Sequence, residues 1–434
     1  MGNILAIVGR PNVGKSTFFN RLVGEREAIE DATSGVTRDR HYGKSDWNGI
    51  SFSVIDTGGY VHNSDDVFEG EIKRQVELAI SEADAILFIT DVHEGFTPMD
   101  EDVADLLRRC KKPVVMAVNK ADNNKMALEI ADFYSSGFGE IFAISAINGS
   151  GTGELLDEIV KSFKPETQEE ESDIARIAIV GRPNAGKSSI LNTLTGEERS
   201  IVTPLAGTTR DSIFTEYNKF GFNFRLVDTA GLRKRTKIDD NVEFYSTVRA
   251  IRSIENSDVC MLVVDATRGF EAQDLHILSI INQNRKGVVI VMNKWDLVEK
   301  DHKTMEQFKE MIEHKIKPQT EVPMVFTSAT EKTRVIKMLE LLQMVHENRR
   351  RKISTSKLNN VMLPIITETA PPMYKGKRVK IKYITQLQLA YPSFVFFCNL
   401  PQYIKEPYRR FIERKMRENF DFAGCNIMLY FREK

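Results

Sequence analysis

The chain has 434 residues, of which 41% are apolar and 28% are charged, a composition typical of globular proteins and not of disordered or fibrous chains. At about 100–200 residues per domain, this length predicts two to four domains. The 60 Lys and Arg residues balance 61 Asp and Glu residues, so the net charge of −1 identifies no partner. The longest apolar runs, such as Phe394–Cys398, are far too short to span a membrane.

The N-terminal residues do not suggest export from the cell. The apolar run Ile4–Val8 follows Met1 without a basic leader, so we expect a cytoplasmic protein. Four cysteines are scattered without a Cys-x-x-Cys pair, and we expect buried thiols in preference to disulfides or zinc ligands. They are Cys110, Cys260, Cys398 and Cys425.

An internal repeat organises the chain. The segment Ile7–Ser16 (IVGRPNVGKS) returns as Ile179–Ser188 (IVGRPNAGKS), an offset of 172 residues. A period of this length predicts two tandem domains, 1–164 and 174–348, joined by an acidic linker over 165–173. The remainder, 349–434, forms a basic tail domain, since Arg351–Lys434 contains 16 Lys and Arg but only 6 Asp and Glu.

Short apolar runs alternate with helix-like segments in both copies, which predicts a mostly parallel sheet with flanking helices, an α/β fold, twice. In the first copy the predicted strands are 4–8, 52–55, 85–90, 114–118 and 141–144; in the second they are 177–180, 224–227, 259–264, 288–292 and 324–326.

The pattern Gly-x-x-x-x-Gly-Lys-Ser follows the first strand of each copy and opens a helix, as a phosphate-binding loop requires. Its backbone N–H groups and the helix N-terminus favour phosphate. We expect Lys15 and Lys187 to contact the β- and γ-phosphates, and Ser16 and Ser188 to ligate Mg²⁺. The two loops are Gly9, Arg10, Pro11, Asn12, Val13, Gly14, Lys15 and Ser16, and Gly181, Arg182, Pro183, Asn184, Ala185, Gly186, Lys187 and Ser188.

Two further segments are expected to sense the γ-phosphate. Asp56 and Asp228 suit the surroundings of the Mg²⁺ ion, while Thr37 and Thr209 are hydroxyls that can close on the ion and on the γ-phosphate. Simple helix caps are the alternative for these two threonines. The motif after each second predicted strand comprises Asp56, Thr57, Gly58, Gly59 and Tyr60, and Asp228, Thr229, Ala230, Gly231 and Leu232.

Base specificity is expected from the Asn-Lys-x-Asp segments at the carboxyl end of a strand in each copy. A carboxylate there accepts two hydrogen bonds from guanine, whereas adenine cannot supply that pair. The segments are Asn119, Lys120, Ala121 and Asp122, and Asn293, Lys294, Trp295 and Asp296. The cofactors are therefore GTP or GDP with Mg²⁺.

The residues expected to orient the attacking water imply that hydrolysis uses another device, is very slow, or is absent. Many phosphate-loop GTPases orient the attacking water with a glutamine, but Tyr60 and Leu232 occupy that place and cannot do so. Asn12 and Asn184 offer a candidate device, because their amide oxygens can help bind a monovalent cation against the phosphates; an asparagine that only shapes the loop remains the other interpretation. The expected catalytic set is Asn12, Lys15 and Thr37, with Asn184, Lys187 and Thr209.

The tail predicts a helix, two strands, a helix and a final strand, an α+β domain. Basic residues gather on its first strand region (Lys375, Lys377, Arg378, Lys380, Lys382) and its second helix (Arg409, Arg410, Arg414, Lys415, Arg417). Such density indicates an RNA phosphate backbone as partner, with a solvated or interdomain face as the alternative.

Taken together, the duplicated motifs and the basic tail resemble the bacterial Der (EngA) GTPase family over essentially the whole chain. The resemblance implies two GTPase domains, a C-terminal domain similar to KH folds, K⁺-stimulated hydrolysis, and action in assembly of the large ribosomal subunit. It implies the large subunit and its rRNA as partners, with no membrane and no DNA, and a cytoplasmic, ribosome-associated location. Two departures exist: the tail has no Gly-x-x-Gly loop, and Ser328-Ala329-Thr330 lacks the glycines that follow Ser145-Ala146.

Two other classes stay open from the residues alone. A relative of tRNA-modification GTPases needs a single GTPase unit with a catalytic partner domain, and the chain shows neither. The other is a non-hydrolysing scaffold in which GTP only fixes domain orientation.

Overall fold

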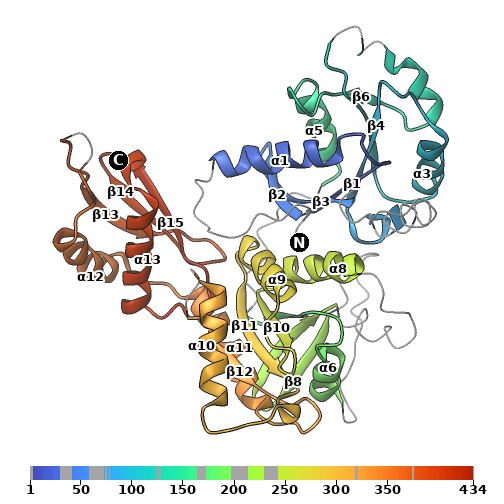
Figure 1. Ribbon diagram of the computed structural model, residues 1–434. Coiled ribbons are helices and arrows are strands. Elements are labelled where there is room, and N and C mark those ends of the chain that lie inside the picture. Colours follow the sequence, from blue (N-terminus) through green and yellow to red (C-terminus); the bar gives the residue numbers. More distant parts are fainter. Residues whose placement is uncertain are drawn as a thin grey trace. The chain divides into compact units, whose positions relative to one another are not determined.

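A computed structural model describes residues 3–29, 42–57, 73, 76–77, 79–123, 126, 129–163, 173–196, 214–228, 243–317, 321–373 and 376–433. The chain divides into two compact units, each described here by itself (Figure 1). One comprises Met1–Ser172 with Val242–Glu255, and the other comprises Asp173–Asn241 with Asn256–Lys434.

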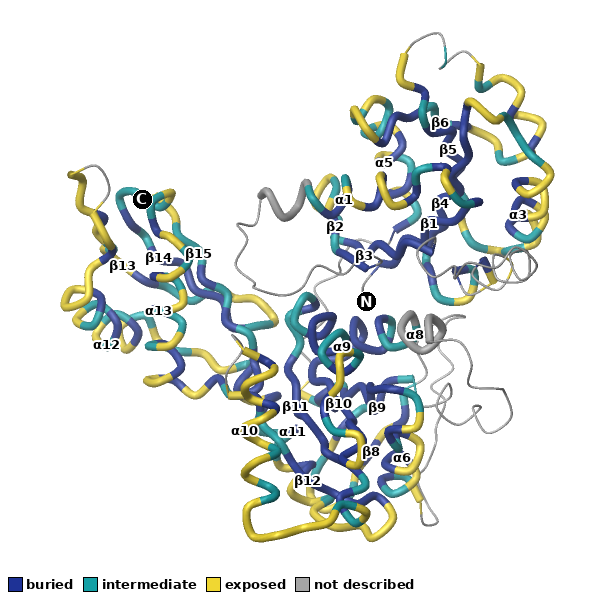
Figure 2. Tube along the Cα trace, viewed as in Figure 1, coloured by how far each residue is buried: buried dark blue, intermediate teal, exposed yellow. Residues whose placement is uncertain are grey.

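The first unit contains a six-stranded sheet in the order β2-β3-β1-β4-β5-β6, in which only the β2–β3 pair is antiparallel. Helices pack on both faces, and the central strands are buried throughout (Figure 2). The elements are β1 (Asn3–Val8), α1 (Lys15–Ile29), β2 (Tyr42–Trp47), β3 (Ile50–Asp56), β4 (Ala85–Asp91), α3 (Pro98–Arg108), β5 (Val114–Asn119), η2 (Glu129–Ser136), β6 (Ile141–Ala143) and α5 (Thr152–Lys161).

The second unit repeats this sheet in the order β12-β11-β10-β7-β9-β8, again with one antiparallel pair, β8–β9. Its elements are β7 (Ala175–Val180), α6 (Lys187–Thr195), β8 (Thr215–Lys219), β9 (Phe222–Val227), β10 (Val259–Asp265), α9 (Ala272–Gln283), β11 (Gly287–Asn293), η4 (Trp295–Leu297), α10 (Thr304–Ile316), β12 (Met324–Phe326) and α11 (Val335–Arg350). Helix α8 (Glu243–Glu255) lies between β9 and β10 in the chain but packs with the first unit. The predicted α/β fold is confirmed for both copies.

A three-stranded sheet, ordered β13-β14-β15, forms the C-terminal domain within the second unit. Strand β13 runs antiparallel and β15 parallel to the central strand. Two helices pack their apolar residues into one core with this sheet. The elements are α12 (Thr355–Glu368), β13 (Ile381–Gln386), β14 (Ser393–Cys398), η5 (Pro401–Tyr403), α13 (Glu406–Asn419) and β15 (Met428–Glu433), which confirms the predicted order of helices and strands.

Backbone hydrogen bonds attach this domain to the second six-stranded sheet. Val288 N donates to Gly424 O at 2.8 Å, and Gly424 N donates to Glu321 O at 2.9 Å. Gly424 has a φ of +76°, and a Cβ there would lie 2.8 Å from Val288 O, so glycine allows this close approach. Cys425 of the same loop belongs to the hydrophobic core of the second sheet. The C-terminal domain and that sheet therefore form one packed structure.

All four cysteines are free; three are buried and Cys110 is partly exposed. Burial raises the pKa of Cys260 to about 11 and that of Cys425 to about 12, which leaves both thiols protonated and unreactive. The expectation of buried thiols holds for Cys260, Cys398 and Cys425. The described helices include none with an apolar stretch long enough to cross a bilayer.

Candidate nucleotide-binding sites

The phosphate loops connect β1 to α1 and β7 to α6, and each wraps around its own lysine. Lys15 Nζ donates to Gly9 O at 2.8 Å and to Arg10 O at 2.7 Å. Lys187 Nζ donates in the same way to Gly181 O and Arg182 O. Burial is the main reason why the pKa of Lys15 falls to about 8. Each loop therefore holds an ammonium group beside backbone that can receive phosphate.

The loop asparagines adopt the left-handed backbone conformation, with φ of 63° at Asn12 and 60° at Asn184. Both side chains are exposed. This conformation shapes the loop, since asparagine tolerates it better than most residues do. It also leaves the amide oxygens available to a ligand, so the geometry is compatible with either interpretation of these residues.

Asparagine at the end of β5 and β11 ties the phosphate loop to the base segment. Asn119 Nδ2 donates to Val13 O at 2.8 Å, and Asn119 Oδ1 accepts from Ala146 N at 2.9 Å. A Cβ at Gly14 would lie only 2.3 Å from Asn119 Nδ2. The second copy repeats this arrangement: Asn293 Nδ2 donates to Ala185 O at 3.0 Å and Asn293 Oδ1 accepts from Ala329 N at 3.1 Å.

The aspartates of the base segments differ in their surroundings. Ser145 Oγ donates to Asp122 Oδ1 at 2.5 Å, which orients this carboxylate. Both serine hydroxyls accept a hydrogen bond from the amide three residues further on, Ser145 Oγ from Asn148 N at 3.3 Å and Ser328 Oγ from Glu331 N at 3.1 Å. Within the described residues only Ser145 also donates to the aspartate of its base segment, while the amide contact of Ala329 with Asn293 matches that of Ala146 with Asn119.

An acidic residue at the end of β4 and β10 holds the lysine of each base segment. Lys120 Nζ lies 2.5 Å from Asp91 Oδ2, and Lys294 Nζ lies 2.6 Å from Asp265 Oδ2. Burial alone would raise the pKa of Asp265, but hydrogen bonds from Lys294 and Thr267 lower it overall. The carboxylate form is thereby stabilised, and it fixes the lysine beside the expected base pocket.

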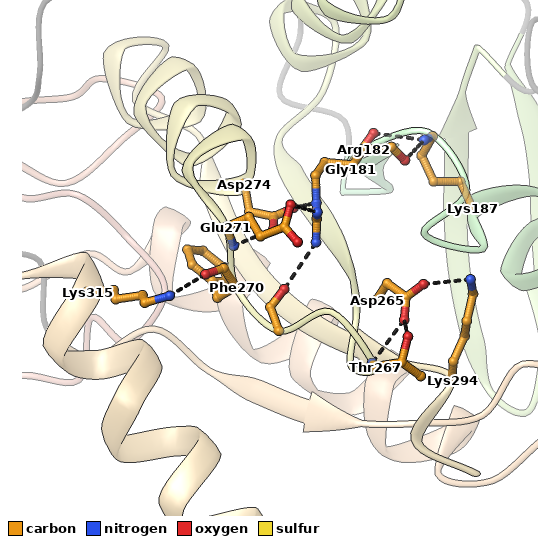
Figure 3. A network of polar contacts seen from close by, with 11 residues as sticks. Gly181, Arg182, Lys187, Asp265, Thr267, Phe270, Glu271, Asp274, Lys294 and Lys315 are labelled. Carbon is orange, nitrogen blue, oxygen red and sulfur yellow. Dashed lines mark hydrogen bonds and ion pairs between the residues drawn. The ribbon is translucent and has the colours of Figure 1, made fainter. Parts of the chain in front are cut away.

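The arginine of each phosphate loop points away from the loop and toward the start of the helix that follows β4 or β10, which is α3 in the first copy and α9 in the second. Figure 3 shows Arg182 reaching Asp274 and Glu271, with Nε to Asp274 Oδ1 at 2.9 Å and Nη2 to Gly269 O at 3.1 Å. Asp274 is fully buried and also accepts from Glu271 N at 2.9 Å, which caps α9.

The first copy has the same design with a different acidic partner. Arg10 Nε donates to Asp100 Oδ2 at 3.2 Å, and Arg10 Nη1 lies 2.7 Å from Glu94 Oε2. Asp100 is fully buried and caps α3 by accepting from Thr97 N at 3.0 Å. In each copy, the segment from the end of β4 or β10 to the first turn of the following helix therefore binds the arginine of the phosphate loop and the lysine of the base segment.

Comparison with known proteins places this geometry in a family. The model "50S ribosome-binding GTPase" matches residues 4–120 and 176–294, and the model "KH-domain-like of EngA bacterial GTPase enzymes, C-terminal" matches 352–432. "GTPase Der" of Christiangramia forsetii is 60% identical over 434 residues, covering 100% of both chains. The chain belongs to the GTPase Der family. GTPase Der of Bacteroides fragilis is 58% identical over 437 residues and that of Porphyromonas gingivalis is 54% identical, each covering 100% of both chains.

Membership of the Der family confirms the predicted resemblance, the tandem GTPase domains and the KH-like C-terminal domain, and it supports GTP hydrolysis. It also implies guanine nucleotide and Mg²⁺ as cofactors. The structure fits such an ion at the first site, since Ser16 Oγ lies 2.5 Å from Asp56 Oδ2, which brings a ligand hydroxyl and a carboxylate together. Bound there, Mg²⁺ would neutralise charge on the phosphates.

Several predicted Der site residues fall outside the described part of the chain. They are Thr37, Gly58, Gly59, Tyr60, Thr209, Thr229, Ala230, Gly231 and Leu232, together with the linker apart from Asp173. Asp228 lies at the end of the described β9 segment, with a φ of 53°.

Sequence reasoning missed the residues that support these loops, above all Asp91, Asp100, Asp265 and Asp274. A signal for them existed. Each aspartate recurs in the second copy at an offset of 174 residues, the same offset that relates Asn119 to Asn293. Aligning the two halves position by position, beyond the familiar motifs, would have found both pairs.

Proposed function

We propose that this GTPase is a nucleotide-controlled factor in assembly and maturation of the large ribosomal subunit, acting in the cytoplasm and on the ribosome. One observation carries the proposal: a C-terminal domain with a net charge of about +10 is joined by backbone hydrogen bonds to a sheet that also carries a nucleotide site. The printed description of the matching family model, a 50S ribosome-binding GTPase, supports the same partner.

The proposed residue roles are those expected from the sequence motifs, and the contacts of the two lysines support them at the phosphate loops. Lys15 and Lys187 bind the β- and γ-phosphates within their loops, and Asp122 and Asp296 accept hydrogen bonds from guanine. Ser16 and Ser188 ligate Mg²⁺, with Asp56 and Asp228 beside it. Thr37 and Thr209 close on the γ-phosphate and release when it is lost, which would change how the basic domain meets rRNA.

Sedimentation with purified ribosomal subunits tests the proposal. Wild-type chain bound to a non-hydrolysable GTP analogue is expected to co-sediment with the large subunit, and to do so less in GDP. Binding is expected to fall steeply with salt, as counterion release requires. The small subunit provides the control. Equal binding to both subunits, or binding that ignores nucleotide and salt, would contradict the proposal.

K⁺ stimulation of hydrolysis is a separate part of the proposal and rests on the exposed amides of Asn12 and Asn184. Phosphate release is expected to be faster in KCl than in NaCl. Two substitutions separate the alternatives at Asn184: glycine keeps the left-handed backbone without the amide oxygen, and aspartate keeps an oxygen there.

If the oxygen binds K⁺, Asn184→Gly loses the stimulation at that site and Asn184→Asp retains it. If the residue only shapes the loop, Asn184→Gly remains stimulated. The same pair at Asn12 reports on the first site, and equal rates in KCl and NaCl for the wild type would end the K⁺ proposal.

A further inference from the structure

The C-terminal domain carries two basic clusters, and their surroundings differ. The helix cluster comprises Arg409, Arg410, Arg414, Lys415 and Arg417 on α13. The strand cluster comprises Lys377, Arg378, Lys380 and Lys382, on β13 and the segment leading into it. The density of positive charge alone gives no reason to prefer one as an RNA contact, because both clusters are strongly basic. Their partners in the structure do.

Glutamates of the same helix neutralise much of the helix cluster. Arg410 lies 3.0 Å from Glu406, and Lys415 lies 2.6 Å from Glu418. Arg417 lies 2.9 Å from Glu413, and its guanidinium is buried, where it also donates to Cys425 O. The two remaining members are held as well. Arg414 lies 3.6 Å from Glu418, and the guanidinium of Arg409 stacks 5.0 Å from the centre of the Phe431 ring.

The strand cluster lacks such compensation. All four side chains are exposed, and within the described part of the chain none has an acidic partner. The surrounding sequence explains this, because the segment 369–405 contains no Asp or Glu. Strand β13 is also an edge strand, so no further strand covers it within its sheet. A polyanion would meet four uncompensated charges here.

An exposed aromatic pair adjoins these charges. Tyr383 is 42% exposed, and its ring centre lies 5.9 Å from that of its cross-strand partner Phe397. The neighbouring residues Ile384 and Phe396 point into the core with α12 and α13. Since successive residues of a strand alternate between faces, Tyr383 and Phe397 lie on the face away from the helices.

We propose that the edge strand β13 binds unpaired RNA, with phosphates along the strand cluster at the edge of the sheet and a base stacked on Tyr383 beside Phe397. The inference rests on the RNA association in the proposed function and names the element that makes it. RNA phosphates would pair with the cations of the strand cluster. Only a polyanion with unstacked bases would also stack on the Tyr383 ring. Duplex RNA hides its base faces, and an acidic peptide leaves the ring without a planar partner.

Fluorescence anisotropy with full-length protein in GDP tests this, using a labelled oligouridylate of about 12 nucleotides as the probe. Tyr383→Ala is expected to weaken binding about tenfold, while Tyr383→Phe keeps the ring and most of the affinity. Lys380→Ala/Lys382→Ala is expected to lower the slope of log affinity against log salt by about 1.4, because two phosphate contacts are lost. None of these variants is expected to change GTP turnover in the absence of RNA.

Arg410→Ala/Arg414→Ala is the matched control, since it removes two exposed cations that are paired with glutamates of the same helix. It is expected to weaken binding less than threefold. The inference is overturned if this control equals the strand variant, if Tyr383→Ala has no effect, or if an RNA hairpin or polyglutamate competes as well as the oligouridylate.

The same variants distinguish this inference from the proposed function. Oligouridylate binding through β13 by a chain that ignores ribosomal subunits would refute the ribosomal role and leave the inference standing. Nucleotide-dependent subunit binding that survives in the strand variants would support the ribosomal role and refute the inference about β13.

Discussion

The two nucleotide sites share one skeleton but differ in the bonds that surround it. In both, asparagine joins the phosphate loop to the base segment, and arginine joins the phosphate loop to helix α3 in the first copy and α9 in the second. The exposed acidic partner of that arginine differs, being Glu94 in one copy and Glu271 in the other. The contacts of the asparagine and of the arginine with its buried aspartate are therefore present in both copies, whereas the exposed acidic partner of the arginine differs.

The supports are more complete at the second site. Arg182 uses Nη2 to reach Gly269 O, whereas Arg10 Nη2 and Asp100 Oδ1 are buried without a hydrogen-bond partner among the described residues. The base segment shows the opposite order, since a serine hydroxyl holds Asp122 but not Asp296 in the described part of the chain. We therefore expect the first site to depend more on base contacts and the second more on its arginine.

The largest expected effect comes from the base aspartates. Asp122→Asn and Asp296→Asn should each weaken GTP binding at their own site by about a hundredfold or more, because the amide no longer complements guanine. Each variant should instead accept xanthosine triphosphate. Titration with both nucleotides measures this, and the unmutated site in each variant serves as the control. Unchanged GTP affinity in both variants would remove these residues from the base pocket.

Removing either arginine should destabilise its own domain by about 3 kcal/mol, because a fully buried carboxylate loses its partner. Arg182→Ala should cost about 1 kcal/mol more than Arg10→Ala, since the bond to Gly269 O is also lost. Hydrogen exchange of the α3 and α9 amides resolves the two domains. Arg268→Ala, on the exposed part of the same loop, is the control.

Adding Asp274→Asn to Arg182→Ala should restore at least half of the lost stability, because no buried charge then remains unpaired and the amide oxygen can still accept from Glu271 N. Failure to recover, or an equal loss in Arg268→Ala, would show that the buried pair does not hold α9.

Nucleotide affinity at the first site should decrease with pH. The pKa of Lys15 is lowered to about 8, so this ammonium loses its proton above pH 8, where an ordinary lysine keeps it. Since a phosphate ligand binds the charged form, affinity should fall by about tenfold between pH 7 and pH 9. Asp296→Asn protein, with GTP bound only at the first site, allows the titration. A GTP affinity that does not change between pH 7 and pH 9 would show that Lys15 does not lose its proton in this range.

The smallest expected difference concerns the serines after β6 and β12. Ser145→Ala should weaken GTP binding at the first site by about threefold to tenfold, because the hydroxyl that orients Asp122 is lost. Ser328→Ala, its counterpart, should change second-site affinity less than twofold. Equal effects in the two variants would mean that the hydroxyl contact is not what distinguishes the base segments.

Sequence alone predicted the parts of the fold that bury continuous apolar runs. Ile4–Val8 and Val259–Val264 are examples, since strands covered on both faces must be apolar throughout. It missed β2 and β8, because edge strands such as Tyr42–Trp47 (YGKSDW) mix polar and apolar residues. No local pattern marks them as strands; their pairing with β3 and β9 does.

The site was predictable where its chemistry is local. Glycines, lysine and serine within eight positions define a phosphate loop, but Arg10 and Asp100 are 90 residues apart and meet only in the folded chain. Acidic neighbours on the same helix as the basic residues were visible in the sequence: Glu406, Glu413 and Glu418 stand three or four positions from the cations they neutralise.

The loop that carries Gly424 makes the two copies differ in how their cores are completed. By donating to Glu321 O and accepting from Val288 N, and by placing Cys425 in the second core, it completes a domain that the first copy completes with its own chain. The second copy therefore takes part of its core from the tail of the chain. We expect removal of the tail domain to destabilise the second copy and to leave the first unchanged, because only the second packs against this loop among the described residues.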